Sequence, residues 1–175
     1  MSAIEAIRDR LPDVARDIRL NLQSVMDSQS LTADQRWGTA LASAYATRNP
    51  ELRDAFVQDA KAAGVSDALL EDAKAAAVMM GMNNVYYRFR HYMGEQSTYH
   101  TMRANLRMQR IGQVATTKVD FELFCLAVSA INGCEMCVKS HEAVVRNGGL
   151  TDAAVHDSVR IAASIQAAAV ALELG

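Results

Sequence analysis

Helix-forming patterns follow one another along the whole chain, and no stretch alternates Val, Ile and Thr with polar residues as strands do. Capping signals mark where helices begin. Thr32 and Gln35 have capping-box spacing, and Asn49 with Pro50 is typical of an N-cap followed by proline at the first helical position. Ser66 can cap a long helix rich in alanine and methionine. The sequence therefore predicts an all-α fold.

The apolar periodicity and these signals set the expected helices. They cover about residues 4–11, 12–25, 37–45, 50–63, 66–92, 120–132, 134–147 and 151–174. Pro12 suits the first turn of the second helix, and glycines at positions 64, 133 and 148–149 provide breaks. Between residues 97 and 117 the periodicity is weak, which predicts a connector with one short helix near residues 103–109.

The composition fits one globular domain over residues 1–175, because half of the residues are hydrophobic. The formal net charge of -2 gives no electrostatic reason to bind nucleic acid or an anionic membrane. The N-terminus mixes charge into every turn, unlike a signal peptide, and the apolar stretch over residues 161–172 is too short to span a bilayer. We therefore expect a cytoplasmic protein whose three cysteines serve redox or metal chemistry.

The two halves of the chain resemble each other. Leu41-Ala-Ser-Ala-Tyr aligns with Ala127-Val-Ser-Ala-Ile at an offset of 86, and Gly64-Val-Ser-Asp-Ala aligns with Gly149-Leu-Thr-Asp-Ala at an offset of 85. This pattern predicts an internal two-fold repeat of a helical unit. The degenerate copy covers about residues 32–93, and the catalytic copy covers about residues 118–175.

Reactive side chains occur in the second copy alone. Cys134, Cys137 and His141 have the spacing i, i+3 and i+7, which places two sulfurs and an imidazole on one helical face. Asn132-Gly133 can end one helix and place Cys134 in the first turn of the next, where the helix dipole stabilises a thiolate. The Cys-x-x-Cys spacing also allows a reversible disulfide. We therefore predict a redox-active dithiol. The aligned positions of the first copy hold Arg48, Glu51 and Ala55.

Zinc binding is the main alternative for these side chains. Cys134, Cys137, His141 and a carboxylate such as Glu122 could supply four ligands. Structural zinc sites usually pair two such half-sites, and the chain has no second Cys-x-x-Cys and no His-x-x-x-His. Cys125, in an apolar stretch, is interpreted as a small buried core residue.

Glu122 has two interpretations, because it lies at the start of an otherwise apolar helix. The residue pattern alone favours a carboxylate that the helix dipole stabilises near the N-terminus. The alternative is a general base that exchanges a proton with His141 and a thiol, which requires the chain to fold back at Gly133.

Three further groups of residues have structural interpretations. We expect surface or capping positions for His91, His100 and His156, because none of them has a cysteine or carboxylate partner at ligand spacing. Core filling is expected for Met79, Met80 and Met82. The basic and aromatic segment over residues 86–110 is interpreted as a helix end and connector packed against a neighbouring subunit.

Several segments carry a resemblance to a known family. They are Asp17-Ile-Arg-Leu-Asn-Leu, Trp37-Gly-Thr-Ala-Leu-Ala-Ser-Ala, Ala46-Thr-Arg-Asn-Pro, Met80-Gly-Met-Asn-Asn-Val-Tyr-Tyr-Arg, Leu106-Arg-Met, and Phe121-Glu-Leu through Ser129-Ala-Ile-Asn-Gly-Cys. Over nearly its full length the chain resembles the alkyl hydroperoxide reductase AhpD family, within the carboxymuconolactone decarboxylase-like superfamily. The last segment is highly specific.

The resemblance implies an all-α fold with an internal repeat, a homotrimer and a role in peroxide defence. In that role the dithiol receives electrons from the dihydrolipoamide of a lipoylated dehydrogenase-complex subunit. It passes them to a peroxiredoxin and also reduces organic hydroperoxides weakly. No bound cofactor or metal is implied.

The resemblance also assigns residues. Cys137 matches the thiol that attacks peroxide, Cys134 matches its disulfide partner, and His141 and Glu122 match the residues that move a proton away from Cys137. Between the cysteines, the best-known members carry Ser-His where this chain has Glu135-Met136. Met136 cannot carry a proton, so either Glu135 or water takes its place, or the relay runs only through His141 and Glu122. Dithiol exchange is therefore expected to be stronger here than direct peroxide reduction.

Two alternative functions remain at the level of sequence. The first is a carboxymuconolactone decarboxylase-like acid/base enzyme, which would leave the Cys-x-x-Cys motif unused. The second is a non-enzymatic helical module stabilised by zinc.

Overall fold

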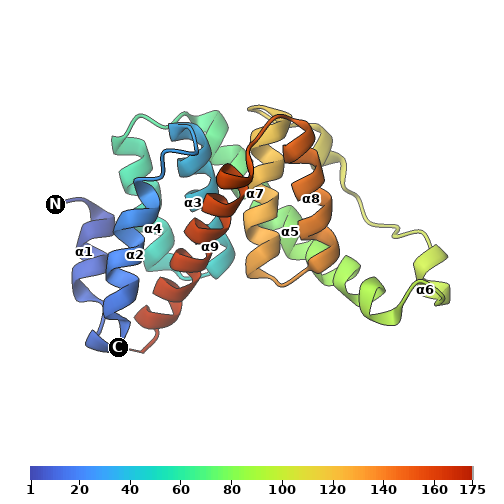
Figure 1. The fold of residues 1–175 in the computed structure, drawn as a ribbon, viewed down its shortest axis with the longest axis horizontal. Helices are drawn as coiled ribbons and strands as arrows, with labels where there is room; N and C mark the ends of the chain where they lie inside the picture. Colours follow the sequence, from blue (N-terminus) through green and yellow to red (C-terminus); the bar gives the residue numbers. More distant parts are fainter. Residues whose placement is uncertain (175) are drawn as a thin grey trace.

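The computed structural model describes residues 1–174, and Gly175, the last residue of the predicted catalytic copy, lies outside the described residues. Residues 1–174 form helices and contain no strand (Figure 1), which confirms the predicted all-α class. The α-helices are α1 (Ala3–Arg10), α2 (Arg16–Met26), α3 (Ala33–Thr47), α4 (Pro50–Ala62), α5 (Asp67–Met93), α6 (Thr98–Thr101), α7 (Lys118–Ile131), α8 (Glu135–Asn147) and α9 (Asp152–Leu172). Short 3-10 turns lie at Asp13–Ala15 and Gln109–Gly112.

The predicted capping signals begin and end the helices as expected. The N–H of Gln35 donates to the Thr32 hydroxyl at 3.2 Å, and the N–H of Thr32 donates to the Gln35 side chain at 3.1 Å. The side chains of Asn49 and Ser66 accept backbone N–H groups at the starts of α4 and α5. Gly64 closes α4 with φ at +79°, a conformation that favours glycine.

Two boundaries differ from the prediction. Pro12 does not lie in the first turn of α2, because the chain first forms the 3-10 turn at 13–15 and α2 begins at Arg16. The short connector helix is α6, and residues 103–108 contain no helix. Asn105 has φ at +51°, which interrupts a right-handed helix, and Arg90 of α5 donates to the carbonyl of His100 in α6.

Helix α7 is the most deeply buried helix and packs against α3, α5, α8 and α9. Its residues 121–129 are all buried. Helix α9 crosses the middle of the molecule in Figure 1, with α1 to α4 on one side and α7 and α8 on the other. The C-terminal end of α5 and α6 extend from this body as an arm. Within residues 1–174, no helix has the length and apolar character needed to pass through a membrane.

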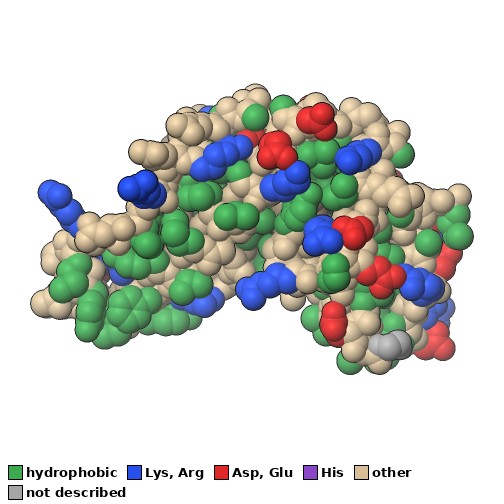
Figure 2. All heavy atoms as spheres, turned by 180° about the vertical axis from the view of Figure 1, so that it is seen from behind, with side chains coloured by type: hydrophobic (Ala, Val, Ile, Leu, Met, Phe, Trp, Pro, Cys, Tyr) green, Lys and Arg blue, Asp and Glu red, His purple; other side chains and the backbone are tan. Residues whose placement is uncertain are grey.

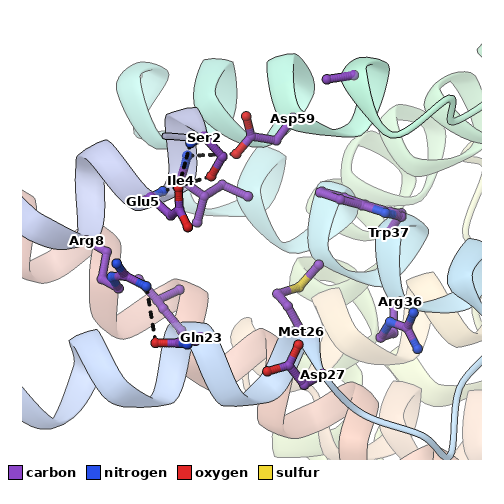
Figure 3. Close-up of a pocket in the computed structure, with 12 residues that line it drawn as sticks. Ser2, Ile4, Glu5, Arg8, Gln23, Met26, Asp27, Arg36, Trp37 and Asp59 are labelled. Carbon is purple, nitrogen blue, oxygen red and sulfur yellow. Dashed lines mark hydrogen bonds between the residues drawn. The ribbon is translucent and has the colours of Figure 1, made fainter.

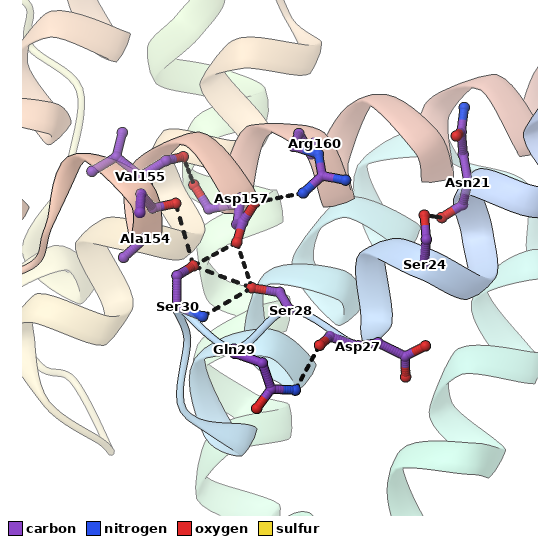
Figure 4. Close-up of polar contacts among 12 residues, drawn as sticks. Asn21, Ser24, Asp27, Ser28, Gln29, Ser30, Ala154, Val155, Asp157 and Arg160 are labelled. Atoms are coloured by element: carbon purple, nitrogen blue, oxygen red, sulfur yellow. Dashed lines mark hydrogen bonds and ion pairs between the residues drawn. The ribbon is translucent and has the colours of Figure 1, made fainter.

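Two aspartates tie the loops before α3 and α7 to the rest of the bundle. Asp72 of α5 accepts hydrogen bonds from the backbone N–H groups of residues 115–116, and Asp157 of α9 accepts from the hydroxyls of Ser28 and Ser30 (Figure 4). The two aspartates are separated by the same offset of 85 as the aligned segments. The internal repeat stays a prediction, and these matching contacts support it.

A cavity of about 450 Å³ lies among α1, α2, α3 and α4 (Figure 3). The carboxylate of Asp59 accepts the backbone N–H groups of Ala3 and Ile4, both at 2.8 Å, and so fixes α1 to α4. Arg36 donates to two carbonyls of the loop before α3. None of the described residues that line this cavity is a cysteine or a histidine. We therefore interpret it as part of the packing of the N-terminal helices.

The close approach of α3 and α7 depends on Gly38, because a methyl group added there would overlap the ring of Phe124. We expect Gly38→Ala to lower the free energy of unfolding by about 1–3 kcal/mol, as overpacking of a tight core does. Gly81→Ala is the control, since the space beside Gly81 in α5 is open and alanine favours a helix. Chemical denaturation measures both variants, and equal effects would contradict this packing.

The acid stability of the fold depends in part on Asp157. Hydrogen bonds from Ser28 and Ser30 lower the pKa of Asp157 from 3.8 to about 2. Because the folded-state pKa lies below the unfolded value, the carboxylate stabilises the fold above about pH 4, and this contribution is lost as the pH falls towards about 2. Urea denaturation across this range should show a shallower loss of stability for Asp157→Asn than for the wild type. Identical slopes would count against the contribution.

Candidate active site

The turn between α7 and α8 folds the chain back at Gly133, which has φ at +65°. The N–H of Cys134 donates to the Ser129 carbonyl at 3.1 Å and closes the end of α7. Helices α7 and α8 then pack against each other, as Figure 1 shows. This fold-back brings Glu122 of α7 to His141 of α8, which is the arrangement that the general-base interpretation requires.

The two cysteines of the Cys-x-x-Cys motif are joined as a disulfide, with their Cα atoms 5.3 Å apart. Cys134 is the N-cap of α8, one position before the predicted first turn, because its N–H is used to close α7. Cys134 is fully buried, whereas Cys137 is 6% exposed. Cys137 is therefore the more accessible cysteine of the pair.

Glu122 is buried in α7 and has two partners. Nδ1 of His141 lies 2.5 Å from Oε2, and Nζ of Lys118 lies 2.6 Å from Oε1. Burial raises the pKa of Glu122, but the hydrogen bonds from His141 and Lys118 outweigh it and hold the pKa below its usual value. Glu122 is therefore an ionised acceptor at neutral pH, and Nδ1 of His141 is its donor.

A cavity of about 310 Å³ gives access to the reactive face of α8. Its lining residues are Tyr87, Met136, Cys137, Ser140 and His141. A small molecule in this cavity meets the Cys137 sulfur and the imidazole together. In this disulfide form, no hydrogen bond within residues 1–174 joins His141 to Cys137, because Nε2 of His141 lies 3.2 Å from Sδ of Met80 instead.

Three residues of α5, spaced i, i+4 and i+8, contact His141 and the turn before α8, and sequence reasoning missed this role for all of them. Met80 is buried as predicted, but its sulfur also contacts the histidine. Asn84 accepts from the side chain of Asn132 and donates to the hydroxyl of Ser129, both at 2.9 Å. Arg88 donates to the carbonyl of Asn132. A buried asparagine in a helix rich in alanine and methionine is the signal that points to such a network, because its amide needs partners.

His91 has a carboxylate partner that its sequence spacing does not reveal. Its Nε2 lies 3.3 Å from Oε2 of Glu135 in the first turn of α8, and Glu135 also binds Lys139 at 2.5 Å. The surface position of His91 is as predicted, and Glu135 is too distant in sequence to be a partner at ligand spacing. Exposed pairs of this kind add little stability, so this contact is a minor one between the end of α5 and the start of α8.

The side chains considered for zinc have other partners in this structure. Within residues 1–174, no group of three His, Cys, Asp or Glu side chains is arranged to hold a metal ion. Cys134 and Cys137 bind each other, and Glu122 is occupied by a histidine and a lysine. Cys125 is buried in the core as predicted, and burial raises the pKa of its thiol.

Comparison with known proteins agrees with the resemblance found in the sequence. A model of the carboxymuconolactone decarboxylase family matches residues 98–174. The chain is 57% identical over 175 residues to the alkyl hydroperoxide reductase AhpD of Anaeromyxobacter sp. (strain Fw109-5), which covers 100% of this chain and 94% of that protein. It is 47% identical over 171 residues to the alkyl hydroperoxide reductase AhpD of Methylocella silvestris, which covers 98% of this chain and 95% of that protein. With such identities over nearly its whole length, the chain belongs to the alkyl hydroperoxide reductase AhpD family.

Proposed function

We propose that this protein is a peroxide-reducing thiol oxidoreductase that works through the Cys134 and Cys137 dithiol. The observation that carries the proposal is one accessible sulfur, Cys137, in a cavity that it shares with the imidazole of His141. The name of the relatives, alkyl hydroperoxide reductase, indicates organic hydroperoxides as the substrate class.

In the oxidative half-reaction, the Cys137 thiolate attacks a peroxide oxygen and the O–O bond breaks. This step leaves a sulfenic acid on Cys137 and an alkoxide, which takes a proton to become an alcohol. The thiol of Cys134 then attacks the sulfenic sulfur, water leaves and the disulfide forms. His141, supported by Glu122, exchanges the proton of the Cys137 thiol.

In the reductive half-reaction, the electron donor is the dihydrolipoamide of a lipoylated dehydrogenase-complex subunit. One lipoyl thiolate attacks Cys137, the more accessible sulfur, and releases Cys134 as a thiolate. The second lipoyl thiolate closes the lipoyl disulfide and releases Cys137. The reduced dithiol then passes both electrons to the disulfide of a peroxiredoxin by the same kind of exchange.

The assembly that we propose is a homotrimer. Exposed apolar side chains gather on the arm formed by the end of α5, α6 and the following residues, as the hydrophobic cluster at the left of Figure 2 illustrates. They include Val85, Phe89, Tyr92, Met93, Tyr99, Met102 and Leu106. A monomer rarely exposes a patch of this kind, and a closed symmetric assembly would cover it.

The dithiol is tested by substitution of Cys137. Cys137→Ser should abolish lipoamide-linked peroxide reduction, because a hydroxyl cannot form the disulfide. Cys125→Ala is the control and should retain turnover, since Cys125 is a buried core thiol. Coupled turnover and thiol counting with dihydrolipoamide measure both. Full turnover in Cys137→Ser would overturn the proposed dithiol mechanism, and stoichiometric zinc in fresh protein would favour the zinc-stabilised module.

The apolar wall at Met136 predicts an imbalance between the two half-reactions. We expect slow oxidation by cumene hydroperoxide and faster exchange with dihydrolipoamide, because Met136 cannot deliver a proton to the departing alkoxide. Met136→His should raise the hydroperoxide rate by at least about tenfold and leave the exchange rate nearly unchanged. Met136→Leu is the matched control in stopped-flow measurements. Wild-type oxidation that outpaces exchange would overturn this expectation.

A further inference from the structure

Both ring nitrogens of His141 have a partner. Nδ1 lies 2.5 Å from Oε2 of Glu122, and Nε2 lies 3.2 Å from Sδ of Met80. Ionised Glu122 can only accept a hydrogen bond, so the ring carries a hydrogen on Nδ1. The charge state of the ring therefore depends on Nε2, the atom that faces Met80.

The thioether of Met80 can also only accept. Its sulfur carries no hydrogen and is a weak acceptor, and the side chain is 1% exposed, so water does not replace it. Nδ2 of Asn84 faces the same sulfur at 3.6 Å as a second donor. A bare Nε2 would set its lone pair against those of the sulfur, whereas a protonated Nε2 donates to it. The contact therefore favours the doubly protonated ring.

We propose that Met80 is a positioning residue of the redox site, whose thioether accepts the Nε2–H of His141 and holds the ring as an imidazolium while the disulfide is closed. The inference rests on the proposed function, in which His141 exchanges a proton with Cys137. The carboxylate of Glu122 balances the positive charge of the imidazolium from the Nδ1 side, so Met80 needs to supply only a neutral hydrogen-bond acceptor at Nε2.

The stored proton is used when the disulfide is reduced. As the lipoyl dithiol becomes a disulfide, it gives up two electrons and two protons, and both cysteines are released in turn. Cys137 leaves as a thiolate, the Nε2–H bond of His141 breaks, and an S–H bond forms at Cys137. Cys134 takes one lipoyl proton and the other goes to water, while His141 stays neutral with its hydrogen on Nδ1. A thioether competes weakly for the Nε2 hydrogen, whereas a carboxylate would retain it.

The neighbours of Met80 on α5 agree with a role beyond core filling. One turn and two turns further along the helix, Asn84 and Arg88 hold Asn132, which lies two residues before Cys134. One side of α5 therefore contacts both the histidine and the turn that carries the first cysteine. If Met80 only filled the core, leucine would serve equally well.

Met80→Leu separates the two roles, because it nearly conserves volume and removes the acceptor. Met82→Leu is the matched control, the same exchange at a half-buried position of α5. NMR of nitrogen-15-labelled, oxidised protein at neutral pH reports the hydrogens on the ring nitrogens of His141, and the exposed His156 is an internal reference. We expect the Nε2–H signal in the wild type and in Met82→Leu, and its loss in Met80→Leu with the Nδ1–H signal retained.

Stopped-flow reduction by dihydrolipoamide provides the second measurement. The rate should fall about tenfold in Met80→Leu, the effect of losing one hydrogen bond to a charged group, and should stay at the wild-type value in Met82→Leu. An Nε2–H signal that persists in Met80→Leu, or a wild-type rate in that variant, overturns the proposal. The proposed function is tested separately, because it fails if Cys137→Ser retains turnover. The NMR comparison of the Met80 and Met82 variants does not depend on turnover.

Discussion

The buried carboxylate of Glu122 is the constraint on which the rest of the site depends. It is 5% exposed in α7, where every residue from 121 to 129 is buried, and an unpaired charge in such a place costs several kcal/mol. The fold therefore has to bring donors to it. Lys118 comes from the same helix one turn earlier, and His141 arrives only because the chain reverses at Gly133. The α7 and α8 hairpin thus satisfies a buried charge as well as joining two apolar surfaces.

Helix α5 forms the opposite wall of the site and holds the turn between α7 and α8. Asn84 and Arg88 bind the side chain and the carbonyl of Asn132, so the residues just before Cys134 are held from outside the hairpin. A Cα separation of 5.3 Å between the two cysteines lies within the range that a disulfide accepts. A backbone held in this way lets the sulfurs join and separate by side-chain rotation, which suits the redox cycle that we propose.

Local signals explain which parts of the fold the sequence predicts. Thr32, Asn49 and Ser66 act through hydrogen bonds to residues three positions away, so a short window of sequence contains the whole interaction. The predicted position of the connector helix is wrong because α6 is held by the contact of Arg90 with the carbonyl of His100, ten residues away, and helical spacing and capping signals do not reveal such a contact. The Cys-x-x-Cys face is predictable from helical spacing alone. The roles of Met80 and Asn84 are not predictable in this way, because their contacts are with residues of other helices that are distant in sequence.

The surroundings of the imidazole bear on how the two half-reactions differ. His141 contacts one thioether, Met80, and shares its cavity with another, Met136, as well as with the hydroxyl groups of Tyr87 and Ser140. An alkoxide is strongly basic and needs a proton as the O–O bond breaks, whereas a departing thiolate is much less basic and depends less on the proton that it receives. Because Met136 adds no proton donor beside Cys137, we expect the site to be better matched to disulfide exchange than to peroxide cleavage. In the mechanism that we propose, the thioether of Met80 keeps the proton on His141 until Cys137 is released, and Met136 offers no further proton to an oxygen leaving group.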